Sequence, residues 1–357
     1  MEYTNRMLLK GNEAVVYGAL RLNRQLMAKT AASTASPTPA SEIAHTAARC
    51  FPKLGRTFLQ AECEIAAINM VMGAAANGRR AMTASSGLGI SLKQEGISYL
   101  SGCELPALVV DITRGGPGLG NIAPEQADYN QVVKGGGHGS YRCIVLAPAS
   151  AQEMCDLAFT AFDLAEKYRI VVYMLTDGVI GQTMETVTLP EPLPRREVPE
   201  WALDVSRPRT NMISSIYLET DDLEALNLRL QEKYRRIEAA EQRCELYQAE
   251  DADVLLVGYG ISGRLARTAV DELRERGIRA GLLRPITLFP FPVDELRRLR
   301  AKQLIAVEMS CGQMIDDVKL AINCDRPVHL INRMGGNIPG TGEIVERTIK
   351  LISAEEK

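Results

Sequence analysis

The sequence has no apolar run long enough to cross a lipid bilayer. Such a run needs about 18 or more residues with few charges, and the apolar stretches of this 357-residue chain are shorter. The segment from Met1 to Lys10 carries an acid at Glu2 and leads into no extended apolar segment, which does not fit a secretory signal. We therefore expect a cytoplasmic protein that does not enter a membrane.

The eight cysteines are scattered, and no two are separated by only two residues. Because zinc and iron–sulfur sites usually draw two or more ligands from one short loop, we expect no metal site in this chain and interpret the cysteines as buried, reduced thiols. The three histidines, His45, His138 and His329, are far apart, and no serine lies in a Gly-x-Ser-x-Gly turn, so a hydrolase triad has no support.

The chain also lacks a strong net charge. With 41 basic and 44 acidic residues the net charge is -3, so a nucleic acid is not expected as a partner. A hydrophobic share of 46% provides enough apolar material for two cores, and the length favours two domains over one.

The first half alternates helical and strand-like segments. Apolar residues recur at helical spacing over 61–76 and 151–167, and short apolar runs bounded by turns predict strands at 81–83, 106–112, 143–146 and 171–176. This alternation predicts a mostly parallel sheet covered by helices on both faces.

Composition changes after residue 189, where four prolines within ten residues predict an extended connector. The charged stretch 221–245 predicts one long helix exposed to solvent. A second α/β pattern begins at Asp253. We therefore divide the chain into a first α/β domain (1–190), a linker with the charged helix (191–250) and a second α/β domain (251–357).

Two glycine-rich loops follow predicted strands, Arg114-Gly-Gly-Pro-Gly-Leu-Gly-Asn121 and Lys134-Gly-Gly-Gly-His-Gly139. Loops at the carboxyl ends of parallel strands are where open α/β sheets bind ligands. Glycine lets the backbone approach a ligand closely, and Arg114 can form a fork of hydrogen bonds to a carboxylate or phosphate. The turn Thr83-Ala-Ser-Ser-Gly-Leu-Gly89 fits either an anion site or a plain helix cap.

Two further features allow two interpretations each. Gly258-Tyr-Gly-Ile-Ser-Gly263 matches a dinucleotide-binding turn, but the next strand carries Arg284 in place of the expected acid, so either NADP binding or a tight structural turn fits. Glu62 and Glu64 lie at the start of an apolar helix, where the helix dipole alone favours carboxylates. Burying Glu64 would nevertheless require a partner.

These segments give the sequence a family resemblance. It resembles the α-type subunits of 2-oxoacid:ferredoxin oxidoreductases, above all the branched-chain 2-oxoisovalerate group and its 2-oxoglutarate relatives. The matching segments are Gly11-Asn-Glu-Ala14, the run from Phe58 to Ile68, Gly96-Ile-Ser-Tyr-Leu100, Arg114 to Ile122, Lys134 to Gly139, Arg284 to Pro290, Val307 to Met314 and Arg333-Met-Gly-Gly336.

The resemblance implies a thiamine-diphosphate-enzyme pyrimidine-binding domain followed by a transketolase C-terminal-like α/β domain. It implies oxidative decarboxylation of a 2-oxoacid, with the branched-chain acid favoured, to an acyl-CoA with reduction of ferredoxin. It assigns cofactor activation to Glu64, the second acid of Glu-Cys-Glu, which bonds the aminopyrimidine ring. The other candidates are Thr38 and Arg114 for substrate, and Ser86, Gly87, Gly89, Gly115, Gly116 and Asn121 for thiamine diphosphate.

By the same resemblance this chain holds half of a site. A β-type subunit is expected to carry the diphosphate, Mg²⁺ and [4Fe-4S] sites, a γ-type subunit completes a hetero-oligomer, and coenzyme A is a co-substrate. The chain should be inactive alone. The family's Tyr-Pro-Ile-Thr-Pro loop is Ala35-Ser-Pro-Thr-Pro39 here, and Leu88 replaces a common proline. These changes make a non-catalytic paralogue the first alternative. An NADP-binding dehydrogenase that uses Gly258–Gly263 is the second, less favoured alternative.

Overall fold

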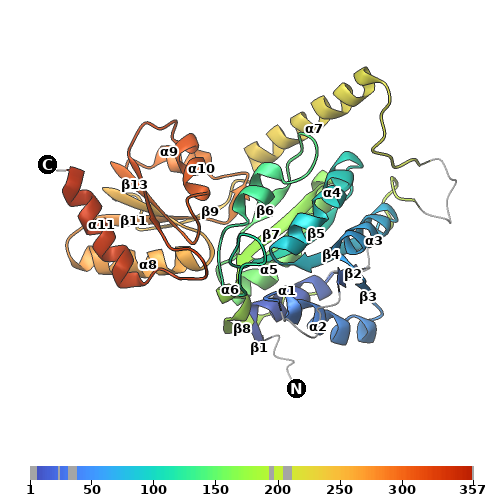
Figure 1. Cartoon of the computed structure of the whole chain (residues 1–357), viewed down its shortest axis with the longest axis horizontal. Coiled ribbons are helices and arrows are strands. Elements are labelled where there is room, and N and C mark those ends of the chain that lie inside the picture. Colours follow the sequence, from blue (N-terminus) through green and yellow to red (C-terminus); the bar gives the residue numbers. More distant parts are fainter. Residues whose placement is uncertain (1–5, 23–24, 31–37, 193–196, 204–210, 356–357) are drawn as a thin grey trace.

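The computed structural model describes residues 6–22, 25–30, 38–192, 197–203 and 211–355. Two α/β units, each built around its own sheet, lie beside one another, the first in blue to green and the second in orange to red (Figure 1). A long helix, α7 (Thr220–Ala240), lies between them in the chain. The α/β fold class and the two-unit organisation follow the sequence pattern.

The sheet of the first unit has seven strands in the order β12-β6-β7-β5-β4-β2-β3. Six strands are parallel, and β12, at the edge, is antiparallel to β6. All four predicted strands are present, as β4 to β7, and they are fully buried, as expected for apolar runs covered on both faces. The strands are β2 (Gln25–Thr30), β3 (Thr57–Ala61), β4 (Arg80–Ser85), β5 (Ala107–Thr113), β6 (Ile144–Leu146), β7 (Val171–Asp177) and β12 (Thr287–Phe289).

Helices cover both faces of this sheet. The chain crosses from β4 through β5 to β6 in one direction and then returns to β7, so right-handed crossovers place α4 and α5 on opposite faces. Helix α3 packs on α4, and α1 packs on α5. The helices are α1 (Gly11–Leu20), α2 (Ser41–Cys50), η1 (Pro52–Leu54), α3 (Glu64–Ala76), α4 (Leu88–Gly102), η2 (Asn130–Gly135), α5 (Ala151–Tyr168) and α6 (Gly178–Gln182); β1 (Arg6–Lys10) and β8 (Met184–Thr188) form a separate antiparallel pair.

The second unit has a five-stranded sheet in the order β14-β13-β10-β11-β9, with only β9 antiparallel among these described strands. Its elements are β9 (Cys244–Tyr247), β10 (Val254–Val257), α8 (Gly260–Glu275), β11 (Ala280–Pro285), α9 (Val293–Arg298), β13 (Gln303–Glu308), α10 (Met314–Ala321), β14 (Val328–Asn332) and α11 (Thr341–Glu355).

The predicted charged helix over 221–245 was too long. Helix α7 ends at Ala240, and Cys244–Tyr247 forms the edge strand β9. The cause is a tertiary contact, because the N–H of Arg243 donates to Thr287 Oγ1 at 2.9 Å and its carbonyl accepts from Ile286 at 2.9 Å. The prolines do produce a connector without helix or strand in the described parts of residues 189–219. No helix within the described ranges combines the length and apolarity that a membrane crossing requires.

Candidate active site

The carboxyl ends of strands from both sheets face a common cavity of about 680 Å³. The first unit contributes the loops after β4 and β5, and the second contributes the loops after β13 and β14. Such edges are where parallel α/β sheets place ligands. The lining includes Gly87, Leu88, Arg114, Gly115, Gly116, Glu125 and Asp128 from the first unit, and Cys311, Gln313, Met334 and Gly335 from the second.

Glu64 is the first residue of α3 and is half-buried. The helix starts here because Cys63 caps it, its Sγ accepting from the Ala66 N–H at 3.4 Å. Glu64 lies against the first turn of α4, where a Cβ at position 89 would be 3.2 Å from Glu64 Oε1 and 2.1 Å from Ser85 Oγ. Gly89 therefore allows the two helix starts to approach. Of the apolar residues that follow Glu64 at helical spacing, Ile68 and Val71 are buried, whereas Ile65 is 43% exposed.

The turn between β4 and α4 brings three predicted residues together. Ser86 is only 5% exposed, and its Oγ has no hydrogen-bond partner among the described residues. Gly87 has a positive φ of 54°, and a Cβ there would lie 3.1 Å from Nε of Arg114. Glu64 and Arg114 thus flank the same turn, and neither forms an ion pair within 4.0 Å with any described residue.

The loop after β5 is tied to the second unit. The Glu125 carboxylate accepts from the Gly116 N–H at 2.8 Å and from the Gly335 N–H at 2.6 Å. The Asn121 side chain accepts from the Ala123 N–H at 2.9 Å and donates to the Gly335 carbonyl at 3.0 Å. Gly115 and Gly116 line the cavity, whereas the amide of Asn121 is engaged within the protein.

Thr38 lies just before α2, where its N–H donates to Ser41 Oγ at 2.9 Å. The side chain of Asn12 on α1 fixes this loop, because it donates to the Pro39 carbonyl at 2.7 Å. None of the hydrogen bonds of Thr38 to described residues reaches Glu64 or Arg114. The divergent positions 35–37 lie outside the described residues.

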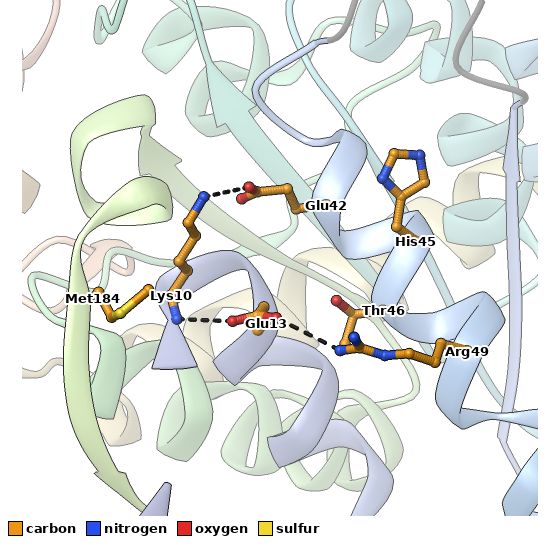
Figure 2. Close-up of a pocket in the computed structure, with 7 residues that line it drawn as sticks. All are labelled: Lys10, Glu13, Glu42, His45, Thr46, Arg49 and Met184. Atoms are coloured by element: carbon orange, nitrogen blue, oxygen red, sulfur yellow. Dashed lines mark hydrogen bonds and ion pairs between the residues drawn. The ribbon is translucent and has the colours of Figure 1, made fainter. Parts of the chain in front are cut away.

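A second cavity, of about 390 Å³, lies along α2, and none of the candidate residues lines it (Figure 2). Its charges are paired: Lys10 Nζ lies 2.5 Å from Glu42 Oε1, and Arg49 lies 3.6 Å from Glu13. The remaining lining residues are His45, Thr46 and Met184. Because its charges neutralise one another, we interpret this cavity as a surface feature of the β1–α2 packing.

Two carboxylates and a lysine near the turn were missed by the sequence analysis. Asp128 lines the cavity, and burial raises its pKa to about 6. Lys93 on α4 is 0% exposed, and burial lowers its pKa to about 8 against the attraction of Glu64 and Asp111. Lys93 occupies a core position of its helix, three residues after Ile90 and four before Ile97, and a lysine at such a position is unusual enough to notice.

The Gly258–Gly263 turn joins the two units. The Ile261 N–H donates to the Asp177 carboxylate at 2.9 Å, and Ser262 Oγ donates to Gln126 Oε1 at 3.0 Å. Arg284 pairs with Glu153 at 2.6 Å and Glu245 at 2.8 Å. A carboxylate of this chain occupies the helix start, and the arginine is already paired, so the structure favours the structural turn over an NADP site.

Gln126 makes the same joint tighter. Its amide nitrogen donates to the Tyr259 carbonyl at 3.0 Å, and its oxygen also accepts from the Met309 N–H at 2.9 Å. The residue is 1% exposed, so these bonds form without competition from water. The joint therefore holds the loops on both sides of the larger cavity in fixed positions.

The cysteines differ partly from expectation. All eight are free thiols, but only Cys103, Cys143 and Cys155 are buried, and Cys311 and Cys324 are exposed. Loops rather than strands carry both exposed thiols, which explains why an apolar-residue rule failed for them. Within the described ranges, no three His, Cys, Asp or Glu side chains gather as metal ligands would.

Comparison with known proteins agrees with this geometry. Residues 29–249 match the family model described as "Pyruvate flavodoxin/ferredoxin oxidoreductase, thiamine diP-bdg", and residues 252–344 match "Pyruvate:ferredoxin oxidoreductase core domain II". The chain belongs to this family. It is thus a subunit of a thiamine-diphosphate-dependent 2-oxoacid oxidoreductase, an enzyme that acts with partner subunits, as the sequence analysis predicted.

The relatives in this family are similar over almost their whole length. The chain is 55% identical to the ketoisovalerate oxidoreductase subunit VorB of Methanothermobacter thermautotrophicus, covering 95% of this chain and 96% of that protein. It is 35% identical to the 2-oxoglutarate synthase subunit KorA of Methanocaldococcus jannaschii, over 96% and 98% of the two chains.

Two solved structures support the fold. The 2-oxoglutarate:ferredoxin oxidoreductase from Magnetococcus marinus, with 2-oxoglutarate, coenzyme A and succinyl-CoA bound, matches with a TM-score of 0.86 and 26% identity, over 98% of this chain and 66% of that chain. A split-gene transketolase, an inactive β4 tetramer, matches with a TM-score of 0.57 and 14% identity over 95% of both chains, a likeness of fold alone. The predicted transketolase-like organisation is confirmed.

Proposed function

We propose that this chain is the pyrimidine-binding subunit of a branched-chain 2-oxoacid:ferredoxin oxidoreductase, in which Glu64 activates the cofactor. The observation that carries the proposal is the position of Glu64 at the start of α3, against Gly89 and beside the β4–α4 turn, in a chain 55% identical to a ketoisovalerate oxidoreductase subunit. A cytoplasmic location is part of the same proposal.

The residues present fit thiamine diphosphate. Glu64 offers a half-buried carboxylate without a hydrogen bond to any described residue, and Ser86 offers a buried hydroxyl without a partner. When bound, thiamine diphosphate supplies the nucleophilic carbon that a 2-oxoacid needs for decarboxylation. Glu64 holds or releases a proton at its carboxylate, and Ser86, Gly87 and Gly89 form the surface that receives the ring.

Arg114 is the substrate-binding residue of this proposal. Its guanidinium lies over Gly87 and lines the larger cavity, so it presents a planar fork to a carboxylate. Gly115 and Gly116 leave room beside it. Thr38 is proposed to contact the substrate, and Asn121 to hold the Gly115–Gly116 loop in the shape that binds the cofactor.

The other half of the site is assigned to partner subunits. We propose that a β-type subunit carries the diphosphate, Mg²⁺ and [4Fe-4S] sites, that a γ-type subunit completes the complex, and that electrons pass to ferredoxin while coenzyme A accepts the acyl group. An apolar surface beside Glu64 supports a partner there, because Ile65 on α3 and Leu88, Leu92 and Tyr99 on α4 are each at least 41% exposed.

The test is reconstitution with the partner subunits. The complex, loaded with thiamine diphosphate and its iron–sulfur clusters, should reduce a viologen dye when given 2-oxoisovalerate and coenzyme A. Glu64→Gln should lower turnover at least about 100-fold and leave assembly intact. Glu62→Gln is the matched control, since Glu62 is exposed two residues away and should keep full turnover.

Two outcomes would overturn the proposal. A wild-type rate in the Glu64→Gln complex would remove the role of Glu64. A fully loaded wild-type complex that reduces no dye with any 2-oxoacid would identify this chain as the non-catalytic paralogue. Preference for 2-oxoglutarate over 2-oxoisovalerate would correct the substrate alone.

A further inference from the structure

A buried lysine lies directly behind the Glu64 site. Lys93 on α4 is 0% exposed, and its Nζ has no hydrogen-bond partner among the described residues. Lys93 follows Gly89 by one helical turn, so both lie on the same face of α4, and Gly89 is the residue that touches Glu64. The lysine therefore lies one helical turn after the residue of α4 that contacts Glu64.

An acid on the sheet, Asp111, also interacts with Lys93. Asp111 is 0% exposed on β5 and pairs in register with Ser85, the last residue of β4 before the turn. Burial raises the pKa of Asp111 well above its usual range, and the neighbouring Asp128 carboxylate raises it further. The groups that interact with Lys93 are Glu64 and Cys63 from the start of α3 and Asp111 from β5.

The buried charge of Lys93 requires a carboxylate partner. A fully buried ammonium group costs several kcal/mol unless carboxylates compensate it. Asp111 alone is a poor partner, since burial and the neighbouring Asp128 carboxylate raise its pKa well above the usual range. Glu64 is the remaining carboxylate that attracts Lys93, and it is the residue to which we assigned cofactor activation.

We propose that Lys93 is a positioning residue that acts through Glu64: its buried ammonium group attracts the Glu64 carboxylate and holds it in place at the start of α3. The inference rests on the proposed function. A carboxylate held in position by a buried cation is already oriented to bond the aminopyrimidine ring of thiamine diphosphate when the cofactor binds. Loss of the cation should therefore weaken cofactor binding.

The test measures thiamine diphosphate affinity by calorimetry in the complex with the partner subunits. Lys93→Met should bind the cofactor roughly tenfold more weakly at pH 7. Since the pKa of Lys93 is about 8, the affinity of the wild type should itself fall as the pH rises from 7 to 9, while the affinity of Lys93→Met should stay flat. Lys233→Met is the matched control, because Lys233 is also buried but pairs with Glu104 at 2.6 Å, in another part of the unit.

A double-variant cycle separates a positioning role from a structural one. Added to Glu64→Gln, Lys93→Met should cause no further loss of affinity, because no carboxylate remains to be held. An equal loss in both backgrounds, or wild-type affinity in Lys93→Met, would overturn the inference. If Lys93→Met prevents assembly, Lys93→Met with Asp111→Asn removes the buried acid together with the cation and carries the same expectations. Failure of the proposed function can be distinguished from failure of this inference, because it appears as wild-type turnover in Glu64→Gln and not as a change in cofactor affinity.

Discussion

The carboxylate of Asp177 accepts a hydrogen bond from the backbone N–H of Ile261 at 2.9 Å, which ties the end of β7 in the first unit to the first turn of α8 in the second. Its other oxygen accepts from the N–H groups of Val179 and Ile180, both at 3.0 Å. One buried side chain thus caps two helices, α6 and α8. Its loss should cost more stability than the loss of a residue that caps a single helix.

Asp177→Ala should therefore destabilise the chain by roughly 2–4 kcal/mol, because three N–H groups lose an acceptor that is itself fully buried. Urea denaturation of the purified chain measures the change. Asp221→Ala, at an exposed position in the first turn of α7, should cost well under 1 kcal/mol. Equal stability of the two variants would show that the Asp177 bonds carry no net energy.

Gly96→Ala tests the packing that sets Glu64 in place. A Cβ at position 96 would lie 2.4 Å from Ile68 Cγ2, so α4 would have to move away from α3, at a cost of about 1–3 kcal/mol. Gly73→Ala on α3 is the matched control, since nothing lies within 4 Å of its Cβ and alanine favours the helix by about 0.5–1 kcal/mol. Thermal melting should shift in opposite directions, and a shift in the same direction would contradict the helix contact.

Arg114→Lys tests substrate binding. Lysine keeps the charge but loses the planar fork, so the KM for the 2-oxoacid should rise about tenfold while thiamine diphosphate affinity stays unchanged. Steady-state kinetics of the complex provides the measurement. Arg298→Lys, on an exposed ion pair with Glu250, should leave KM as it is. An unchanged KM in Arg114→Lys would exclude a forked contact with the substrate.

The buried acid Asp128 should make stability depend on pH. Its pKa is about 6 in the folded chain and near 4 when unfolded, so the folded chain holds the proton more tightly and this residue destabilises the fold as the pH rises from about 4 to 6. Asp128→Asn should gain roughly 1–2 kcal/mol at pH 7, and the gain should vanish near pH 4.

Denaturation of both chains at pH 4.5 and pH 7 measures this difference. Asp316→Asn, at an exposed position on α10, should change stability little at either pH. A loss of stability at pH 7 in Asp128→Asn would mean that the hydrogen bonds of the carboxylate outweigh the cost of burying it.

Much of the fold followed from pattern because long apolar runs and helical spacing are local properties. The strands β4 to β7 were predicted within a few residues. The strands β9 and β12 were not, because each is short and pairs antiparallel at a sheet edge through contacts far away in sequence. Residues 287–289 even join the sheet of the other unit, which no local pattern encodes.

The residues of the candidate site also fall into those with a local sequence signature and those that depend on tertiary contacts. The glycines around Arg114 and the helix start at Glu64 were visible in sequence, because turns and helix starts have local signatures. The role proposed for Lys93 was not visible in sequence, since it depends on α3, α4 and β5 meeting in space. The Gly258–Gly263 turn allowed two interpretations for the same reason, as its partner, Asp177, lies about 80 residues away along the chain.

The buried amide of Gln126 makes the two units poor candidates for recombination. Its bonds match one acceptor and two donors of the second unit, at Tyr259, Met309 and Ser262. A second unit inherited from a distant relative would have to present the same groups at the same places, or leave buried polar atoms unsatisfied at about 1–3 kcal/mol each. Gene fusions and exchanges in this family should therefore preserve the joint as one block, with breakpoints outside it.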